Sequence, residues 1–170
     1  MKIPAFLLAC TLLCVSAFAP TQAQAQPRET RIDALSVLDE QFMAQQRGLL
    51  EDEARRTLGK GFNGDRERDL SLLQELLDKG IVKGDQTREL QAMGVILGDH
   101  LAQDLGMHWV VYEDKIGRSR ALRYRETDNY LFPMTMISRR RAVNNTESVT
   151  AIYNRARNII ENARPVLPYP

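Results

Sequence analysis

Cysteine and histidine are scarce in this chain of 170 residues. The two cysteines, Cys10 and Cys14, lie close to the amino terminus, and the two histidines are His100 and His108. If the amino-terminal leader is removed, no disulfide, thiolate metal site or cysteine nucleophile can form. No Gly-x-Ser-x-Gly elbow, phosphate-binding loop or dinucleotide-binding glycine pattern occurs either. The sequence therefore lacks the common catalytic signatures and indicates no cofactor.

An excess of charge of either sign is also missing. The chain has 23 lysine and arginine residues against 22 aspartate and glutamate residues. Removal of residues 1–25 would take away Lys2 and no acidic residue, which leaves 22 residues of each sign. This balance argues against nucleic acid as the main partner.

The longest apolar run, from Ile3 to Ala19, is short for a membrane span and contains Pro4. It follows a single lysine and precedes Ala23-Gln24-Ala25, which is the layout of a secretory signal with a small-x-small cleavage site. We predict a signal peptide over residues 1–25, cleaved after Ala25, and a periplasmic location. An uncleaved anchor and lipidation at Cys10 stay open as alternatives.

Apolar residues then recur at helical spacing and predict three helices, over residues 31–58, 65–80 and 85–106. Thr30 is the expected N-cap of the first helix, and Asp33 is three residues further on, as in a capping box. We predict an amino-terminal helical segment over residues 26–64, followed by the core of the domain.

The third predicted helix is apolar on nearly all sides, which is typical of a buried helix. Gly94, Gly98 and Ala102 are spaced four residues apart and would leave a smooth groove along it. Each glycine inside a helix costs about 1 kcal/mol relative to alanine. We therefore expect another element to pack closely against this groove.

After Gly106 the pattern becomes that of extended chain, rich in β-branched and aromatic residues. It predicts strands over 107–113, 119–126 and 130–132, and then helices over 134–143 and from about 148 to 163. The fold class is α+β: amino-terminal helices, a three-stranded antiparallel meander and carboxy-terminal helices packed as one domain. The core is expected to cover residues 65–164, and residues 165–170 form a proline-rich tail.

Asp99, His100 and His108 are the candidate catalytic residues. Asp99 follows Gly98 in the predicted buried helix, where a carboxylate could serve as a base or could instead pair with an arginine. His100 and Asp104 are four residues apart and share one helical face. Zinc needs three or four ligands in fixed geometry, and no further ligand has suitable spacing. We therefore predict no metal site.

The arginines are the candidate residues for contact with a ligand or partner. In the second predicted strand, Arg118 and Arg120 share one face, and Arg123 and Arg125 share the other. Three more follow near the end of the next helix, namely Arg139, Arg140 and Arg141. Gathered on one surface, Arg123, Arg125 and this trio could bind phosphate or carboxylate groups through their forked donors. The structural alternative is a charged strand edge and favourable cations at a helix C-terminus.

Several landmarks occur in a familiar order. They are the Leu90–Asp99 segment with its Gly-x-x-x-Gly-acid pattern, Gly106–Val111, Glu113-Asp114, Gly117 and Phe132–Ile137. Over residues 65–140 the chain resembles the bacterial domain of unknown function 3806 family. The resemblance implies one compact domain in a bacterial cell envelope. It implies no activity, cofactor, substrate or catalytic residue.

Two functional hypotheses follow. The first is an exported, non-enzymatic interaction or binding module whose partner is an envelope protein or an anionic polymer. The second is a small periplasmic hydrolase that uses Asp99 with help from His100 or His108.

Overall fold

The computed structural model describes residues 29–163. The predicted signal peptide and the proline-rich tail lie outside the described residues, as does Cys10. The described part contains five helices and a four-stranded antiparallel sheet. In chain order the elements are β1 (Arg31–Ala34), α1 (Val37–Leu58), α2 (Arg66–Asp78), α3 (Thr87–Leu105), β2 (Met107–Glu113), β3 (Arg118–Tyr124), β4 (Tyr130–Leu131), α4 (Pro133–Ala142) and α5 (Val149–Ala163). The predicted α+β class is confirmed, but the sheet has one strand more than predicted.

The additional strand is β1, and the prediction of a helix from residue 31 is wrong there. Arg31 to Ala34 pair antiparallel with β2, from Arg31 opposite Glu113 to Ala34 opposite Val110. Helix α1 begins later, where the Ser36 side chain accepts the Asp39 N–H and the Asp39 carboxylate accepts the Ser36 N–H. Thr30 and Asp33 have the same spacing, so the sequence offers two capping boxes and the fold uses the second.

The sheet has the order β1-β2-β3-β4. Strands β2 and β3 form a hairpin in which Met107 lies opposite Tyr124 and Glu113 opposite Arg118. Strand β3 ends before the predicted residue 126, because Arg125 has a φ of 51° and starts the turn toward β4. Arg125 therefore lies outside the strand in which it was predicted.

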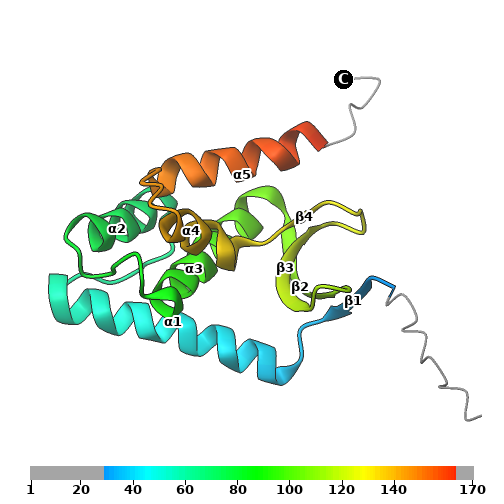
Figure 1. The fold of residues 1–170 in the computed structure, drawn as a ribbon, viewed down its shortest axis with the longest axis horizontal. Coiled ribbons are helices and arrows are strands. Elements are labelled where there is room, and N and C mark those ends of the chain that lie inside the picture. Colours follow the sequence, from blue (N-terminus) through cyan, green and yellow to red (C-terminus); the bar gives the residue numbers. More distant parts are fainter. Residues whose placement is uncertain (1–28, 164–170) are drawn as a thin grey trace, which may run out of the picture.

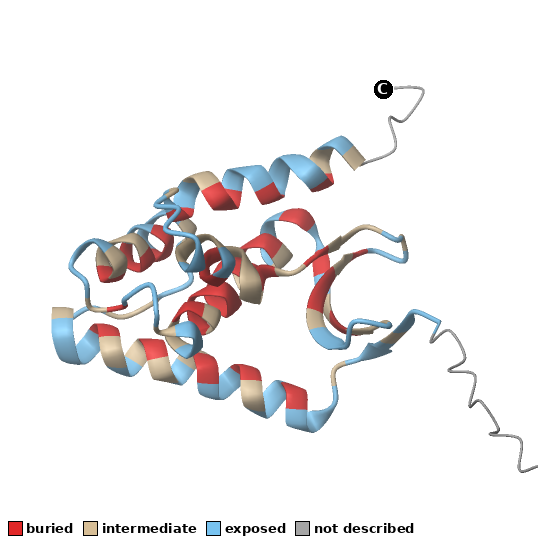
Figure 2. Ribbon diagram, viewed as in Figure 1, coloured by how far each residue is buried: buried red, intermediate tan, exposed pale blue. Residues whose placement is uncertain are grey.

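Helix α3 lies between α1 and α5, and the sheet lies beyond one end of this helical layer (Figure 1). Figure 2 shows buried residues around most of α3, as its apolar sequence predicts. A Cβ at Gly94 would lie 2.4 Å from the Pro133 carbonyl oxygen, and one at Gly98 would lie 2.4 Å from the Trp109 ring. The expected close packing against these glycines is confirmed. The packed elements are the start of α4 and the indole of β2.

None of the helices between residues 29 and 163 has both the length and the apolar character needed to cross a bilayer.

Candidate functional site

Asp99 is held by two partners from distant parts of the chain. Arg47 of α1 donates to both of its oxygens, from Nε at 2.6 Å and from Nη2 at 2.8 Å. The Trp109 indole N–H donates to Oδ1 at 3.0 Å. The hydrogen bond to Asp99 raises the pKa of Arg47 above its ordinary value. The Asp99 side chain is 34% exposed, so it reaches solvent but has most of its acceptor positions filled.

His100 points to a different carboxylate, that of Asp69 on α2. Its Nε2 lies 3.0 Å from Asp69 Oδ2, and both residues are buried. Asp69 also accepts the backbone N–H groups of Asn63 at 3.1 Å and Gly64 at 3.0 Å.

The loop between α1 and α2 is held by a second carboxylate, that of Glu51. Its Oε2 accepts the Phe62 N–H at 2.8 Å. Burial disfavours the charged form of Glu51, but hydrogen bonds from the Phe62 N–H and Arg55 outweigh this effect and lower its pKa. Carboxylates from α1 and α2 thus bind three consecutive amides, those of residues 62–64, which fixes the loop between the two helices.

These groups surround one cavity of about 400 Å³, here called the α1–α3 pocket. Its volume is within the usual range for small-molecule sites, and its inner surface is mainly apolar. The lining residues are Arg47, Gly48, Glu51, Phe62, Gly64, Asp69, Ile96, Asp99, His100 and Gln103. Asp99 and His100, both singled out from the sequence, therefore line the same pocket.

Gly48 has a distinctive place in this pocket. It lies inside α1, where glycine is less favourable than alanine by about 1 kcal/mol. Unlike Gly94 and Gly98, it has no packing reason, since a Cβ built on it would meet nothing within 4 Å. Gly48 is exposed and lines the pocket, so a small side chain at this position would meet open space.

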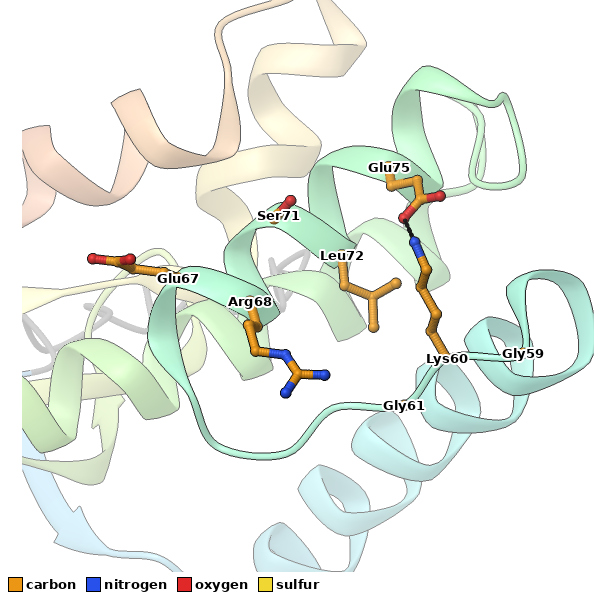
Figure 3. Close-up of a pocket in the computed structure, with 8 residues that line it drawn as sticks. All are labelled: Gly59, Lys60, Gly61, Glu67, Arg68, Ser71, Leu72 and Glu75. Atoms are coloured by element: carbon orange, nitrogen blue, oxygen red, sulfur yellow. Dashed lines mark hydrogen bonds and ion pairs between the residues drawn. The ribbon is translucent and has the colours of Figure 1, made fainter.

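A larger cavity of about 640 Å³ is lined by residues 59–61 of the same loop and by α2 (Figure 3). Arg68 and Leu72 project from α2 toward the loop, and Lys60 reaches across to Glu75 at 2.6 Å. Glu75 is also paired with Lys79 at 2.8 Å. None of the residues singled out from the sequence lines this cavity, so its greater volume does not make it the better candidate.

His108 is not part of the α1–α3 pocket. It is exposed on β2, where its Nε2 lies 4.0 Å from a carboxylate oxygen of Glu126. The structure thus brings Asp99 and His100 to one cavity but leaves His108 outside it. Within residues 29–163, no three histidine, cysteine or acidic side chains are grouped closely enough to hold a metal ion.

Most of the candidate arginines have internal partners. Arg123 donates to the Thr127 carbonyl oxygen at 2.9 Å and to Glu126 at 2.7 Å. Arg140 donates to Glu147 at 2.7 Å, and Arg141 donates to the Glu147 carbonyl oxygen at 3.4 Å.

The other two candidate arginines are exposed. Arg125 lies over the Tyr124 ring, with its guanidinium carbon 5.2 Å from the ring centroid. Arg139 has no ion pair in the described part of the chain. It lines a separate cavity of about 360 Å³ together with Tyr112 and Phe132. Three of the five candidate arginines are thus bound internally, and the other two have different surroundings, so the five do not share one ligand site.

Arg118 and Arg120 bind a buried carboxylate that the sequence did not single out. Arg118 donates two hydrogen bonds to Asp39, at 2.9 and 2.6 Å, and Arg120 lies 2.8 Å from it. The hydrogen bonds from Arg118 hold the pKa of Asp39 well below its usual range. This cluster joins the start of α1 to β3.

Sequence reasoning also missed Arg47, Asp69 and Phe62 as residues of the pocket. One signal was present for Asp69, because it lies four residues before Leu73 and therefore on the apolar face of α2. An acid on a buried face needs a partner. Arg47 and Phe62 carried no comparable signal.

Comparison with known proteins gives a family and a fold. The family model described as Domain of unknown function (DUF3806) matches residues 69–153, which is half of the chain. A crystal structure from Bacteroides thetaiotaomicron VPI-5482, at 1.50 Å resolution, is similar with a TM-score of 0.70 and 18% sequence identity. The similarity covers 78% of this chain and 49% of that one, so this chain spans about half the length of its structural neighbour. No curated protein matches.

Proposed function

The chain belongs to the Domain of unknown function (DUF3806) family, and we propose that it is an exported, non-enzymatic binding module. The family offers no activity to transfer, and the structural neighbour supports the fold alone. The proposal therefore depends on the residues of this chain. We assign the ligand site to the α1–α3 pocket.

Gly48 is the observation that carries the assignment. A glycine within a helix reduces stability, and the fold gains no close contact from this one. Its effect is to leave the wall of the pocket without a side chain. A cavity kept open at a cost in stability is what a binding site requires.

The polar groups of the pocket favour binding over turnover. Asp99 is bound by Arg47 and Trp109, and Asp69 accepts two backbone N–H groups and is hydrogen-bonded to His100. No serine, threonine, cysteine or lysine is among the lining residues, so a hydroxyl, thiol or amine nucleophile is not at hand there. The charged groups orient a ligand in this account, and the apolar surface supplies most of the contact.

The test is an NMR titration of the ¹⁵N-labelled protein with a panel of small aromatic and aliphatic fragments. We expect some fragments to shift the amide signals of residues 62–64, 96 and 103. Gly48→Trp should abolish these shifts by filling the pocket, whereas Gly48→Ala should retain them. Fragment binding that is the same in both variants, or no binding to the wild type at millimolar concentration, would refute the assignment.

Export is part of the proposal and is supported by the leader of residues 1–25. The chain expressed with its own leader in a bacterial host should accumulate in the periplasmic fraction. Amino-terminal sequencing should find Gln26 as the first residue. An intact Met1 on cytosolic protein would contradict the export proposal.

An envelope partner is supported at a second surface. Arg139 is exposed and unpaired in the described part of the chain, and it lies beside Tyr112 and Phe132. An arginine next to aromatic rings suits an anionic polymer or an acidic protein segment. The protein should co-sediment with isolated cell-wall polymer more strongly than Arg139→Gln does. Equal sedimentation of the two proteins would remove this surface from consideration.

The alternative function is a small periplasmic hydrolase, and the His100–Asp69 pair favours it. A carboxylate that orients an imidazole is a common arrangement around a general base, which here would act on water. The role of Asp99 separates the two functions. We expect Asp99→Asn to lower the free energy of unfolding by about 1 kcal/mol, because it weakens a partly exposed ion pair. Turnover of a wall-derived substrate that is lost in Asp99→Asn at unchanged stability would favour the hydrolase.

A further inference from the structure

The cavity of about 360 Å³ beside Arg139, here called the Arg139 cavity, gathers polar groups that the protein itself leaves unused. It is lined by the β2–β3 hairpin, by Phe132 and by Arg139 of α4. Within residues 29–163, several of its polar groups have no hydrogen-bond or ion-pair partner. They are the Tyr112 hydroxyl, the Asp114 Oδ2 atom, the Ser119 hydroxyl and the Arg139 guanidinium. All of them are therefore available to a ligand.

The hairpin holds these groups in fixed positions. Tyr112 lies directly opposite Ser119 in the β2–β3 ladder, so the two side chains share one face of the sheet. Asp114 Oδ1 accepts the Ile116 N–H at 2.8 Å and the Gly117 N–H at 3.1 Å, which fixes the carboxylate in the turn. A site built on such a scaffold loses little freedom when it binds a ligand.

Aromatic rings form the apolar part of the cavity wall. The rings of Tyr112 and Phe132 pack edge to face, with their centroids 5.3 Å apart. A second such contact, at 5.1 Å, joins Tyr112 to Tyr130. The face of an aromatic ring is negative and attracts the positively polarised C–H bonds of a neighbouring molecule. This wall suits a ring-shaped ligand with C–H groups on one face.

The charges of the cavity restrict the ligand further. The charged lining residues are Asp114, Arg118 and Arg139. Arg118 donates from both of its Nη atoms to Asp39, so Arg139 is the lining cation that is free to bind an anion. Asp114 can only accept hydrogen bonds when it is ionised, and it repels additional negative charge. A ligand that satisfies both residues has one anionic group and several hydroxyl groups.

We propose that the Arg139 cavity binds an acidic sugar, in which a polyhydroxyl ring carries one carboxylate. The carboxylate binds Arg139, and the ring lies against Tyr112 and Phe132. The sugar hydroxyls bind Ser119 and Asp114. An acidic protein segment has several carboxylates and few hydroxyls, so it matches these groups less well. The inference rests on the proposed function, because it names the ligand class of the surface around Arg139.

The experiment compares two sugars that differ in one group, methyl β-D-glucuronide and methyl β-D-glucoside. Their dissociation constants are measured by NMR titration of the ¹⁵N-labelled protein. The glucuronide has a carboxylate where the glucoside has CH₂OH, so it gains a charge-assisted hydrogen bond and should bind about tenfold tighter. The amide signals of residues 112–119 should shift. Shifts confined to residues 62–64, in the α1–α3 pocket, would overturn the proposal.

Exposed residues supply the variants and their control. Arg139→Gln should reduce the affinity ratio of the two sugars to about one, whereas Ser119→Ala should weaken both sugars about threefold and keep the ratio. Arg125 is also exposed but does not line the cavity, so Arg125→Gln should keep the wild-type affinities. Surface substitutions of this kind change stability little, so all three variants should fold.

The possible failures are distinguishable. If the wild type and Arg139→Gln co-sediment equally with cell-wall polymer, the proposed surface fails and this inference fails with it. If sedimentation depends on Arg139 but the two sugars bind equally, the surface stands and the acidic sugar is wrong. A tetra-aspartate peptide that binds tighter than the glucuronide would assign the surface to an acidic protein segment. Succinate that binds as tightly as the glucuronide would show that the sugar ring is not recognised.

Discussion

Two glycine-to-alanine substitutions should change stability in opposite directions. Both Gly48 in α1 and Gly94 in α3 lie inside helices, so alanine gains about 1 kcal/mol from helix propensity at either site. At Gly48 the new methyl group meets nothing within 4 Å. The free energy of unfolding should therefore rise by about 1 kcal/mol, and the melting temperature by about 3 °C for a chain of this size.

At Gly94 the same methyl group would collide with backbone. It would lie 2.4 Å from the Pro133 carbonyl oxygen and 2.6 Å from the Met134 Cα, whereas favourable contacts between carbon atoms are about 3.5 to 4.0 Å apart. The start of α4 would have to move, and overpacking of this kind costs about 1 to 3 kcal/mol or more. After the gain in helix propensity is subtracted, we expect Gly94→Ala to lower the free energy of unfolding by about 2 kcal/mol.

Urea unfolding followed by circular dichroism measures both changes, and equal m-values would show that the variants unfold in the same way as the wild type. Gly48→Ala is the matched control for Gly94→Ala. A loss of stability in Gly48→Ala would mean that this position is packed, which would also remove the reason for regarding the pocket as held open. A gain in Gly94→Ala would refute the close contact between α3 and α4.

Two further predictions concern pH. The pKa of Asp39 is lowered by its hydrogen bonds from Arg118, so its contribution to stability is complete well above the ordinary carboxyl pKa of about 4 and is lost as pH falls below it. Asp39→Asn should lower the free energy of unfolding by about 3 kcal/mol at pH 7, which is at the lower end for a buried pair because Arg118 is 43% exposed. The free energy of unfolding of this variant should also depend less on pH between 5 and 2. The same acid dependence as in the wild type would contradict this reasoning. Burial and the hydrogen bond to Asp104 raise the pKa of Tyr153 to about 12. Stability should therefore fall as pH rises from 10 to 12, less so in Tyr153→Phe, and an ultraviolet titration in which every tyrosine ionises near pH 10 would disprove the shift.

Much of the fold could be predicted because its signals are local. The apolar character of α3, the left-handed residue Gly106 at its end and the β-branched run of β2 depend on neighbouring residues only. Strand β1 depends instead on pairing with β2, which is almost eighty residues away along the chain. Its four residues also continue the helical spacing of α1, so nothing local separates the two elements.

The site was predictable only in part for the same reason. Asp99 and His100 could be chosen by residue type, but their partners are set by the fold. Arg47 is 52 residues from Asp99, and Asp69 is 31 residues from His100. The sequence placed both candidates in one helix and could not show that they bind different partners. The four-residue spacing of Gly94, Gly98 and Ala102 predicted the close packing on α3, but nothing in the sequence indicated that Gly48 lines an open pocket.

The central claim is that the α1–α3 pocket is a ligand site. A crystal structure of the protein with phenol at saturating concentration tests this claim most directly. The account predicts the phenol ring inside the pocket, against Phe62 and Ile96. An empty pocket, with phenol bound elsewhere on the protein, would contradict it.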